Sequence, residues 1–208
     1  PVHANRHVMT RSSSPRSSSR TSRFSLANQP AILRPFPLTG RFITFVLRDS
    51  KDPTDALARL ASIDHDPNTV VGIGTPLLDR VGATLSGLRS FPCDLGLFPC
   101  TQAALWLFLA HGDHGAAFDA GRAFASVIAQ AFTVTEEISA FIYRGGRDLS
   151  GFEDGTENPK GNAAIAAAVI NGAGKGLDGG SFVAVQRFAH DLDAIDSMPL
   201  AAREAGMG

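Results

Sequence analysis

The segment with the clearest capacity for chemistry is residues 145–159, GGRDLSGFEDGTENP, which is polar and rich in glycine. Within it, three carboxylates and one amide fall inside six positions: Glu153, Asp154, Glu157 and Asn158. Gly151 and Gly155 free the backbone to approach a ligand closely or to adopt a positive φ. An Asp held in such a turn and aimed into a cavity suits general acid–base catalysis, whereas a simple Asx turn would leave the acids facing solvent. The residues alone leave both alternatives open.

Other short motifs fit their best-known chemistry poorly. Residues 72–74, Gly-Ile-Gly, lack the third glycine of a dinucleotide-binding fingerprint, because Leu77 stands in its place. Residues 174–176, Gly-Lys-Gly, lack the Ser or Thr that follows the lysine of a phosphate-binding loop. The chain contains no Gly-x-Ser-x-Gly nucleophile elbow, which excludes a serine hydrolase of that type.

Two histidines and two cysteines are candidates for metal binding or redox chemistry. His111 and His114 lie in a Gly/Asp-rich stretch with no third ligand in view, which favours a solvated turn over a metal site. Cys93 and Cys100 lack the spacing of a redox pair and are too few for a four-cysteine zinc site. We therefore expect free thiols, no metal held by these residues and, by default, a cytoplasmic location.

The charge of the chain is divided unequally along its length. The formal net charge of the 208 residues is −1, but residues 1–48 contain eight Arg and no Asp or Glu. The remaining residues contain eleven basic and twenty acidic side chains, and a body this acidic would repel the phosphate backbone of a nucleic acid. No run of eighteen apolar residues is present. We therefore predict neither a nucleic acid nor a membrane among the partners.

Hydrophobic periodicity predicts alternating strands and helices in the first two thirds of the chain. Strands rich in β-branched, aromatic and leucine residues are predicted at residues 41–48, 69–73, 103–109 and 134–143. Helices are predicted from residues 52–55 onward, briefly at 75–85, and over the Ala-rich residues 116–132. The order β-α-β-β-α-β is that of the ferredoxin-like split motif, so the predicted fold class is α+β.

A second, shorter cycle of elements follows the glycine-rich loop. It comprises an Ala-rich helix at residues 163–171, a loop at 172–180, a strand at 181–189 and a helix from Asp191. This half is too short to repeat the first, so we expect an incomplete second ferredoxin-like half and a C-terminally truncated chain.

These features divide the chain into three parts. Residues 1–27 form a Ser/Arg-rich tail that lacks the apolar side chains needed to offset its ordering entropy, and we expect it to be disordered. Its composition fits either a transit peptide or an artefact of the gene model. Residues 28–145 are the predicted ferredoxin-like N-terminal domain, and residues 146–208 are a partial C-terminal domain.

Residues 151–159, Gly-Phe-Glu-Asp-Gly-Thr-Glu-Asn-Pro, resemble the Gly-Phe-x-Asp-Gly-Thr-x-Asn-Pro signature of the dye-decolorizing (DyP-type) haem peroxidases. Shorter stretches match that family in the same order, at residues 29–33, 101–106, 145–149 and 180–192. The resemblance implies two ferredoxin-like halves around one haem, as in the dimeric α+β barrel group. It makes residues 146–208 a partial haem-binding domain.

The resemblance also implies roles for individual residues around a haem b. Asp154 would lie on the distal face of the haem and shuttle a proton between the two oxygens of hydrogen peroxide. The backbone around Glu153, Gly155 and Thr156 would pack against the macrocycle. Arg187 would pair with a haem propionate, since a guanidinium is a preferred partner for a carboxylate near an apolar pocket.

One part of the family pattern has no counterpart in this sequence. The family's iron-ligating proximal His, and a distal Arg after it, lie downstream of a segment that these 208 residues do not contain. His190 follows the Asp motif but matches a different family His, so we interpret it as a structural hydrogen-bonding residue and assign no iron ligand. A chain without the axial His is expected to be a poor or inactive peroxidase, and to be marginally stable.

The sequence therefore favours a DyP-type haem peroxidase that oxidises dyes and phenolic compounds with hydrogen peroxide, an aromatic reducing substrate being its second partner. Two alternatives remain open. One is a ferredoxin-like remnant or binding module without haem, and the other is a related haem α+β-barrel enzyme that handles iron or porphyrin. The sequence also leaves open whether the chain forms a homo-oligomer.

Overall fold

The computed structural model describes residues 28–62, 66–85 and 102–207. The strands are β1 (Thr39–Leu47), β2 (Thr69–Ile73), β3 (Leu105–Leu109) and β4 (Phe132–Phe141). The helices are the 3-10 turn η1 (Pro30–Ile32), α1 (Thr54–Ser62), α2 (Thr75–Val81), α3 (His114–Ile128), α4 (Asn162–Ala168), α5 (Leu192–Ser197) and α6 (Leu200–Met207). The predictions for the Ser/Arg-rich tail and for Cys93 and Cys100 concern residues outside these described ranges.

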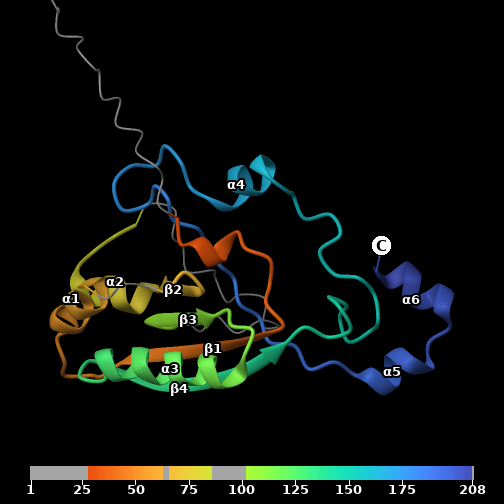
Figure 1. Cartoon of the computed structure of the whole chain (residues 1–208), viewed down its shortest axis with the longest axis horizontal. Coiled ribbons are helices and arrows are strands. Elements are labelled where there is room, and N and C mark those ends of the chain that lie inside the picture. Colours follow the sequence, from red (N-terminus) through yellow and green to blue (C-terminus); the bar gives the residue numbers. More distant parts are fainter. Residues whose placement is uncertain (1–27, 63–65, 86–101, 208) are drawn as a thin grey trace, which may run out of the picture.

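The four strands form one antiparallel sheet in the order β2-β3-β1-β4 (Figure 1). Strand β1 pairs with β3 on one side and with β4 on the other, and the β1–β4 register shifts between Thr44 and Phe45. The predicted order β-α-β-β-α-β is confirmed, with the short helix α2 inserted between β2 and β3. The α+β class and the ferredoxin-like arrangement of the first half are therefore correct.

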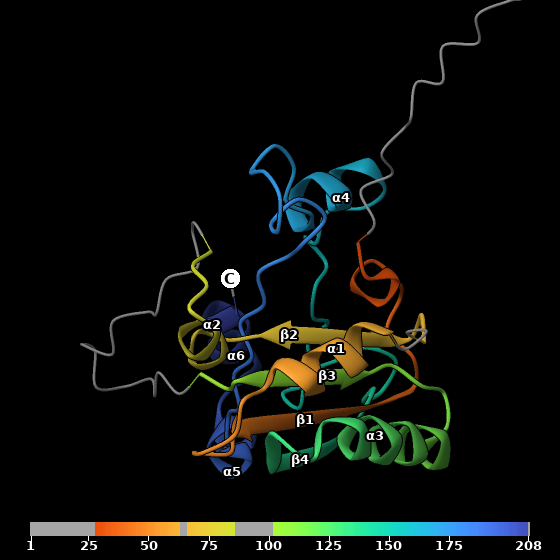
Figure 2. The ribbon, with the colours of Figure 1, turned by 90° about the vertical axis from the view of Figure 1, so that its left-hand side faces the viewer.

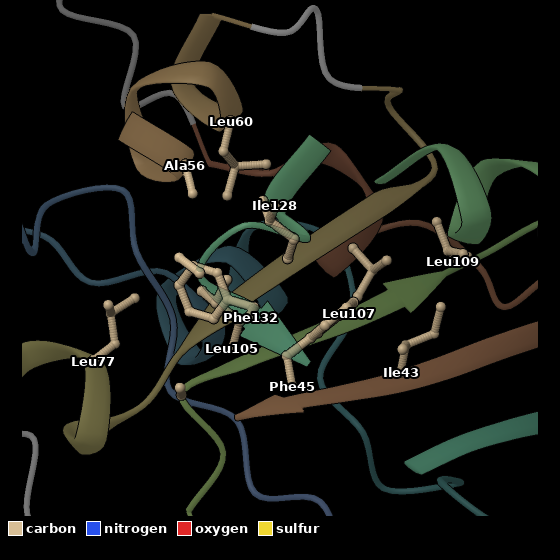
Figure 3. Packing of buried hydrophobic residues seen from close by; sticks show 12 residues of the cluster. Ile43, Phe45, Ala56, Leu60, Leu77, Leu105, Leu107, Leu109, Ile128 and Phe132 are labelled. Carbon is tan, nitrogen blue, oxygen red and sulfur yellow. The ribbon is translucent and has the colours of Figure 1, made fainter. Parts of the chain in front are cut away.

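Helices α1 and α3 lie together on one face of the sheet (Figure 2). The side chains that fill the space between the helices and the sheet are almost fully buried (Figure 3): Ile43, Phe45, Leu105, Leu107, Leu109, Ile128 and Phe132. Gly121 allows α3 to approach the strands, because a Cβ there would lie 2.7 Å from Cδ1 of Ile43 and 3.2 Å from Cδ1 of Leu109. This cluster is the hydrophobic core.

Local polar contacts fix where the helices begin. Asp113 caps α3 by accepting a hydrogen bond from the N–H of Ala116 at 2.8 Å. Asp52 accepts hydrogen bonds from the N–H and the hydroxyl of Thr54 at the start of α1, at 2.9 and 2.7 Å. Such caps satisfy amide groups that have no partner inside the helix. The sequence predicted helix α1 from these residues, with Pro53 in its first turn.

At the edge of the sheet formed by β2, one side chain forms hydrogen bonds with the strand backbone. Gln29 donates from Nε2 to the carbonyl of Val71 at 3.0 Å and accepts at Oε1 from the N–H of Val71 at 2.7 Å. The amide thus imitates a paired strand residue at a position where free backbone groups would otherwise invite association.

Aromatic rings line the sheet face opposite α1 and α3. The ring of Phe42 stacks against Phe108 and Trp106, with centroids 4.8 and 5.8 Å apart. Phe36 meets Phe108 edge to face at 6.3 Å. The stacking extends across β1 and β3 because Phe42 is the register partner of Phe108.

The last third of the chain carries three short helices. Helix α4 occupies most of the Ala-rich segment predicted to be helical, and α5 begins after Asp191, whose side chain accepts from the N–H of Ala194 at 2.9 Å. Figure 1 shows α5 and α6 beside the end of the sheet rather than over the hydrophobic core. None of the described helices has the length and apolar character needed to cross a membrane.

The strand predicted at residues 181–189 is wrong. Residues 181–190 have no regular secondary structure, and four of their apolar side chains are 56–60% exposed: Phe182, Val183, Val185 and Phe188. High β-propensity requires a neighbouring strand and a surface to pack against. No strand of the described sheet pairs with this segment, so its apolar, β-branched composition does not become a strand.

Leu107 tests which residues stabilise the fold. It is 0% exposed at the centre of the core, so Leu107→Ala should lower the free energy of unfolding by about 2–5 kcal/mol. Leu38→Ala removes the same atoms from a side chain that is 71% exposed and is the matched control. Urea unfolding followed by circular dichroism measures both. Equal effects of the two substitutions would contradict the core assigned here.

Candidate active site

The loop between β4 and α4 carries the acidic motif. It leaves the sheet at a fixed point, because the N–H of Ile142 donates to the carbonyl of Leu38 at 3.0 Å and so extends the β1–β4 pairing. The backbone then reverses through positive φ at Arg144 (41°), Gly145 (75°) and Gly146 (107°). Glycine adopts this conformation without steric cost, which explains the two consecutive glycines.

Arg147 joins the two sides of the small hairpin that follows. Its backbone forms an isolated antiparallel bridge with Glu153. Its guanidinium donates from Nη1 to the carbonyl of Gly151 at 2.8 Å and from Nη2 to Oε1 of Glu153 at 2.9 Å. The motif predicted from the sequence is therefore an ordered hairpin with an ion pair across it.

Asp148 forms the turn inside this hairpin. Its Oδ1 accepts hydrogen bonds from the N–H of Ser150 at 2.9 Å and from the Ser150 hydroxyl. These bonds, chiefly the one from the hydroxyl, hold the pKa of Asp148 below its ordinary value because they stabilise the carboxylate. The carbonyl of Asp148 also accepts from the N–H of Gly151 at 3.1 Å, which closes the turn.

Asp154 follows Glu153 at the end of the hairpin. Its N–H donates to the carbonyl of Gly146 at 3.3 Å, so its backbone is tied to the start of the loop. Its side chain is exposed, and its carboxylate has no hydrogen-bond partner among the described residues. Of the two alternatives that the sequence left open, this environment matches the solvent-facing acid.

The other predicted site residues divide into two groups. Glu153 and Thr156 are exposed and Gly155 is half-buried in the same loop, next to Asp154. Gly155 has φ 73°, and a Cβ there would lie 2.6 Å from Nδ2 of Asn158, so a larger residue would disturb the turn. Arg187 is 78% exposed and donates to Oε1 of Glu136 on β4 at 3.0 Å. The structure therefore groups the loop residues, while Arg187 pairs with the sheet.

The histidines show no metal-binding arrangement. Nε2 of His111 lies 3.2 Å from Oδ2 of Asp66, an ion-pair distance without hydrogen-bond geometry, and His114 is the first residue of α3. Within the described residues, no group of three His, Cys, Asp or Glu side chains is placed to hold a metal ion. His190 is exposed and has no hydrogen-bond partner in the described part of the chain, so its expected structural role finds no support.

Two open hollows in the described structure lie at the start of α1. One, of about 290 Å³, is lined by Lys51, Asp52, Asp55, Ala56, Gln130 and Ala131. The other, of about 740 Å³, is lined by residues 49–54 with Arg80 and Val81. Neither includes a residue of the 145–159 loop, so no predicted site residue lines them.

Sequence reasoning assigned no role to four residues that shape the loop or contact Arg187. The spacing of Asp148 and Ser150 is that of an Asx turn, and this signal was available in the sequence. Nothing local pointed to Arg147 as the partner of Glu153, or to Glu136 as the partner of Arg187. Glu136 lies 51 positions from Arg187, and only the fold brings the two together.

The sequence also matches known proteins over most of its length. A family model described as "Dyp-type peroxidase, C-terminal" matches residues 145–208, the part that contains the Asp154 loop. A dye-decolorizing peroxidase of Rhodococcus erythropolis is 29% identical over 199 residues, covering 86% of this chain and 58% of that protein. The dye-decolorizing peroxidase of Mycobacterium tuberculosis is 30% identical over 199 residues, covering 85% and 58%.

Solved structures of Dyp-type proteins are also similar to this chain. DyPB from Rhodococcus jostii RHA1 superposes with a TM-score of 0.73 at 29% identity, covering 86% of this chain and 63% of that one. A variant of that DypB in complex with heme gives a TM-score of 0.74 at 29% identity over the same shares. A Dyp-type protein from Shewanella oneidensis, 22% identical with a TM-score of 0.74, shares the fold.

The sheet, its helix layer and the hairpin after β4 define an α+β protein with a ferredoxin-like first half. The chain belongs to the Dyp-type peroxidase family. It spans about three fifths of the length of the relatives that it matches, 58% of the two dye-decolorizing peroxidases named above.

Because the Asp148–Ser150 turn lowers the pKa of Asp148, we expect the stability that this turn contributes to depend on pH. Ser150→Ala removes the hydroxyl that lowers the pKa of Asp148, so this pKa should return toward its ordinary value of 3.8. Because the folded pKa is depressed, the turn contributes stability above the ordinary pKa and loses it as the pH falls through the folded value. An NMR titration of the side-chain carboxyl carbon measures the change, with Thr156→Ala as a control hydroxyl in the same loop. An unchanged Asp148 titration in Ser150→Ala would refute the assignment.

Proposed function

We propose that this chain is part of a haem peroxidase of the DyP type, which uses hydrogen peroxide to oxidise dyes and phenolic compounds. In this proposal residues 28–145 are the ferredoxin-like domain and residues 146–208 belong to the haem-binding domain, with haem b as the cofactor. Family membership supports the reaction class.

One observation supports Asp154 as the acid–base group of the proposed reaction. The carboxylate of Asp154 has no hydrogen-bond partner among the described residues, while its backbone belongs to a hairpin whose two sides are paired. A general acid–base group must be available to the reactant and must also be held in place. Glu153, its neighbour, does not meet the first condition, because its carboxylate is paired with Arg147.

The described residues include several of the groups that a haem site needs. Asp154 has an exposed carboxylate, Gly155 follows it with a positive φ of 73°, and Phe182, Val185 and Phe188 are exposed apolar side chains. A haem site combines such an apolar lining with a few placed polar groups. The two hollows at the start of α1 include none of these residues.

In the proposed mechanism the protein contributes proton transfer and orientation. Haem, when bound, supplies the redox chemistry with hydrogen peroxide. The Asp154 carboxylate takes the proton from one peroxide oxygen and returns it to the other, which makes that oxygen a better leaving group. The backbone of Glu153, Gly155 and Thr156 would pack against the macrocycle. Arg187, which is exposed and now paired with Glu136, would exchange that partner for a propionate.

The open environment of Asp154 favours one alternative function. A ferredoxin-like binding module without haem would also leave this acid in solvent, as it is here, and would use exposed apolar side chains such as Phe182 and Phe188 for contacts. The two functions differ in one property, the binding of haem.

Haemin titration separates these functions. The 208-residue chain should develop a Soret band with stoichiometric haemin. The haem-loaded chain should be a poor peroxidase, because these residues supply no axial His, but it should still oxidise a dye with hydrogen peroxide faster than free haemin does. Asp154→Asn should lower that rate by about a hundredfold or to the level of free haemin, because the proton acceptor is lost. Glu157→Gln, an exposed acid of the same loop, is the control. Absence of a Soret band would support the haem-free module, and an unchanged rate in Asp154→Asn would remove Asp154 from the mechanism.

Arg187 tests the propionate contact. Arg187→Ala should weaken haemin binding about three- to fivefold, the effect of losing one exposed ion pair. Glu136→Gln frees Arg187 from its present partner and should not weaken binding. Lys175→Ala removes another exposed cation of the C-terminal part and serves as the control. Equal haemin affinity in the wild type and Arg187→Ala, measured by Soret titration, would exclude this role.

A further inference from the structure

In the described part of the chain, the carboxylate of Asp154 has neither a hydrogen bond nor an ion pair, so its position depends on the backbone that carries it. The N–H of Asp154 bonds to Gly146 at 3.3 Å, a distance at the long end for such a bond. Together with the bond from the N–H of Asp148 to the carbonyl of Phe152, at 3.0 Å, this hydrogen bond ties together through the backbone the residues between Gly146 and Asp154. Whatever holds those residues determines where the acid points.

Two side-chain interactions add to this backbone pairing, and only one of the two reaches across the hairpin. The Asp148–Ser150 bonds are local and close the turn at its tip. Arg147 instead reaches from the first side of the hairpin to the second, where it binds both the carbonyl of Gly151 and the carboxylate of Glu153. The residues that it holds therefore lie immediately before Asp154.

The backbone of Gly151 is held on its N–H side by the hydrogen bond to the carbonyl of Asp148 at 3.1 Å. Its φ is 93°, and no heavy atom lies within 4 Å of the position that a Cβ would occupy. No side-chain packing therefore limits its rotation, and glycine has more accessible backbone conformations than any other residue. The hydrogen bond from Nη1 of Arg147 to its carbonyl, at 2.8 Å, supplies a restraint at this point.

The two contacts need the shape of an arginine. A guanidinium offers two donors in a fixed plane, so one side chain can bind a carbonyl and a carboxylate two residues apart. A lysine carries the same charge but has no fixed pair of donors. Arg147 and Glu153 are 42% and 64% exposed, so solvent screens their attraction and the contribution is mainly geometric.

We propose that Arg147 is the positioning residue for Asp154: its guanidinium clamps Gly151 and Glu153 and thereby fixes the backbone that aims the Asp154 carboxylate. The catalytic consequence rests on the function proposed above, whereas the clamp itself does not. Glu153 then acts through its side chain as the anchor of the clamp, in addition to the backbone role that the family resemblance implies for it.

The clamp is tested first without haem. In the 208-residue chain, Arg147→Ala and Arg147→Lys should each raise the amide hydrogen-exchange rates of Asp148, Gly151 and Asp154 by about tenfold, while the amides of β1 and β3 stay unchanged. Arg144→Lys is the matched control, because the Arg144 guanidinium lies over the ring of Tyr143, 5.1 Å from its centroid, and outside the clamp. Glu153→Gln should give an intermediate increase. Unchanged exchange in both Arg147 variants would overturn the proposal.

The effect on Asp154 is tested by a double-mutant cycle in the haem-loaded chain. Arg147→Ala should lower kcat for peroxide-driven dye oxidation by about tenfold with unchanged haemin affinity, as expected for a misplaced acid. In the Asp154→Asn background, Arg147→Ala should have no further effect, because no acid remains to be positioned. Arg147→Lys should not restore the rate.

The outcomes separate the two proposals. If Asp154→Asn slows the reaction and Arg147→Ala does not, the positioning role is wrong and the proposed function stands. If Asp154→Asn has no effect, or the chain binds no haemin, the proposed function fails and hydrogen exchange alone decides the clamp. Independent, additive effects of the two substitutions would also overturn positioning.

Discussion

The pairing of β1 on both of its edges is the constraint on which the rest of the structure depends. Strand β1 shares hydrogen bonds with β3 and β4, and its inward side chains, Ile43 and Phe45, form the floor of the core under α3. Its first residue, Thr39, pairs with the last residue of β4, Phe141. The loop that carries Asp154 therefore starts from a rigid position, although the loop itself lies outside the core.

The fold was largely predictable from the sequence, because buried segments of this chain carry strong periodic patterns. The strand at residues 69–73 matches β2 in both bounds, and the other three strands of the sheet agree to within two residues. The exception is residues 181–189, whose composition is equally typical of a strand. For that segment β-propensity alone gives the wrong secondary structure. A strand forms only when it can pair with another strand, and the composition of a segment does not say whether such a partner is present.

The site was less predictable than the fold, for a different reason. The motif located the loop and the acid, because glycines and carboxylates at fixed spacing are visible in sequence. Two of the contacts that give the site its geometry are pairs of ordinary surface residues, Arg147 with Glu153 and Arg187 with Glu136. Exposed ion pairs leave no pattern in hydrophobicity or composition, so only coordinates reveal them. Asp148 with Ser150 is the intermediate case, where an i, i+2 spacing was a usable signal.

The ion pairs and hydrogen bonds within the loop explain why the carboxylate of Asp154 is available to a reactant, whereas those of Glu153 and Asp148 are not. Glu153 is bound by Arg147, and Asp148 is bound by Ser150, so both acids are used to hold the hairpin. Glu157 is exposed, like Asp154, but the backbone bond to Gly146 ties only Asp154 to the base of the loop. A residue that moves a proton needs both a free carboxylate and a restrained backbone. An acid that is already paired resists protonation. An acid on a mobile backbone is seldom in the reactive position. Within the described loop, Asp154 combines the two, and the neighbouring acids make that combination possible by stabilising the hairpin around it.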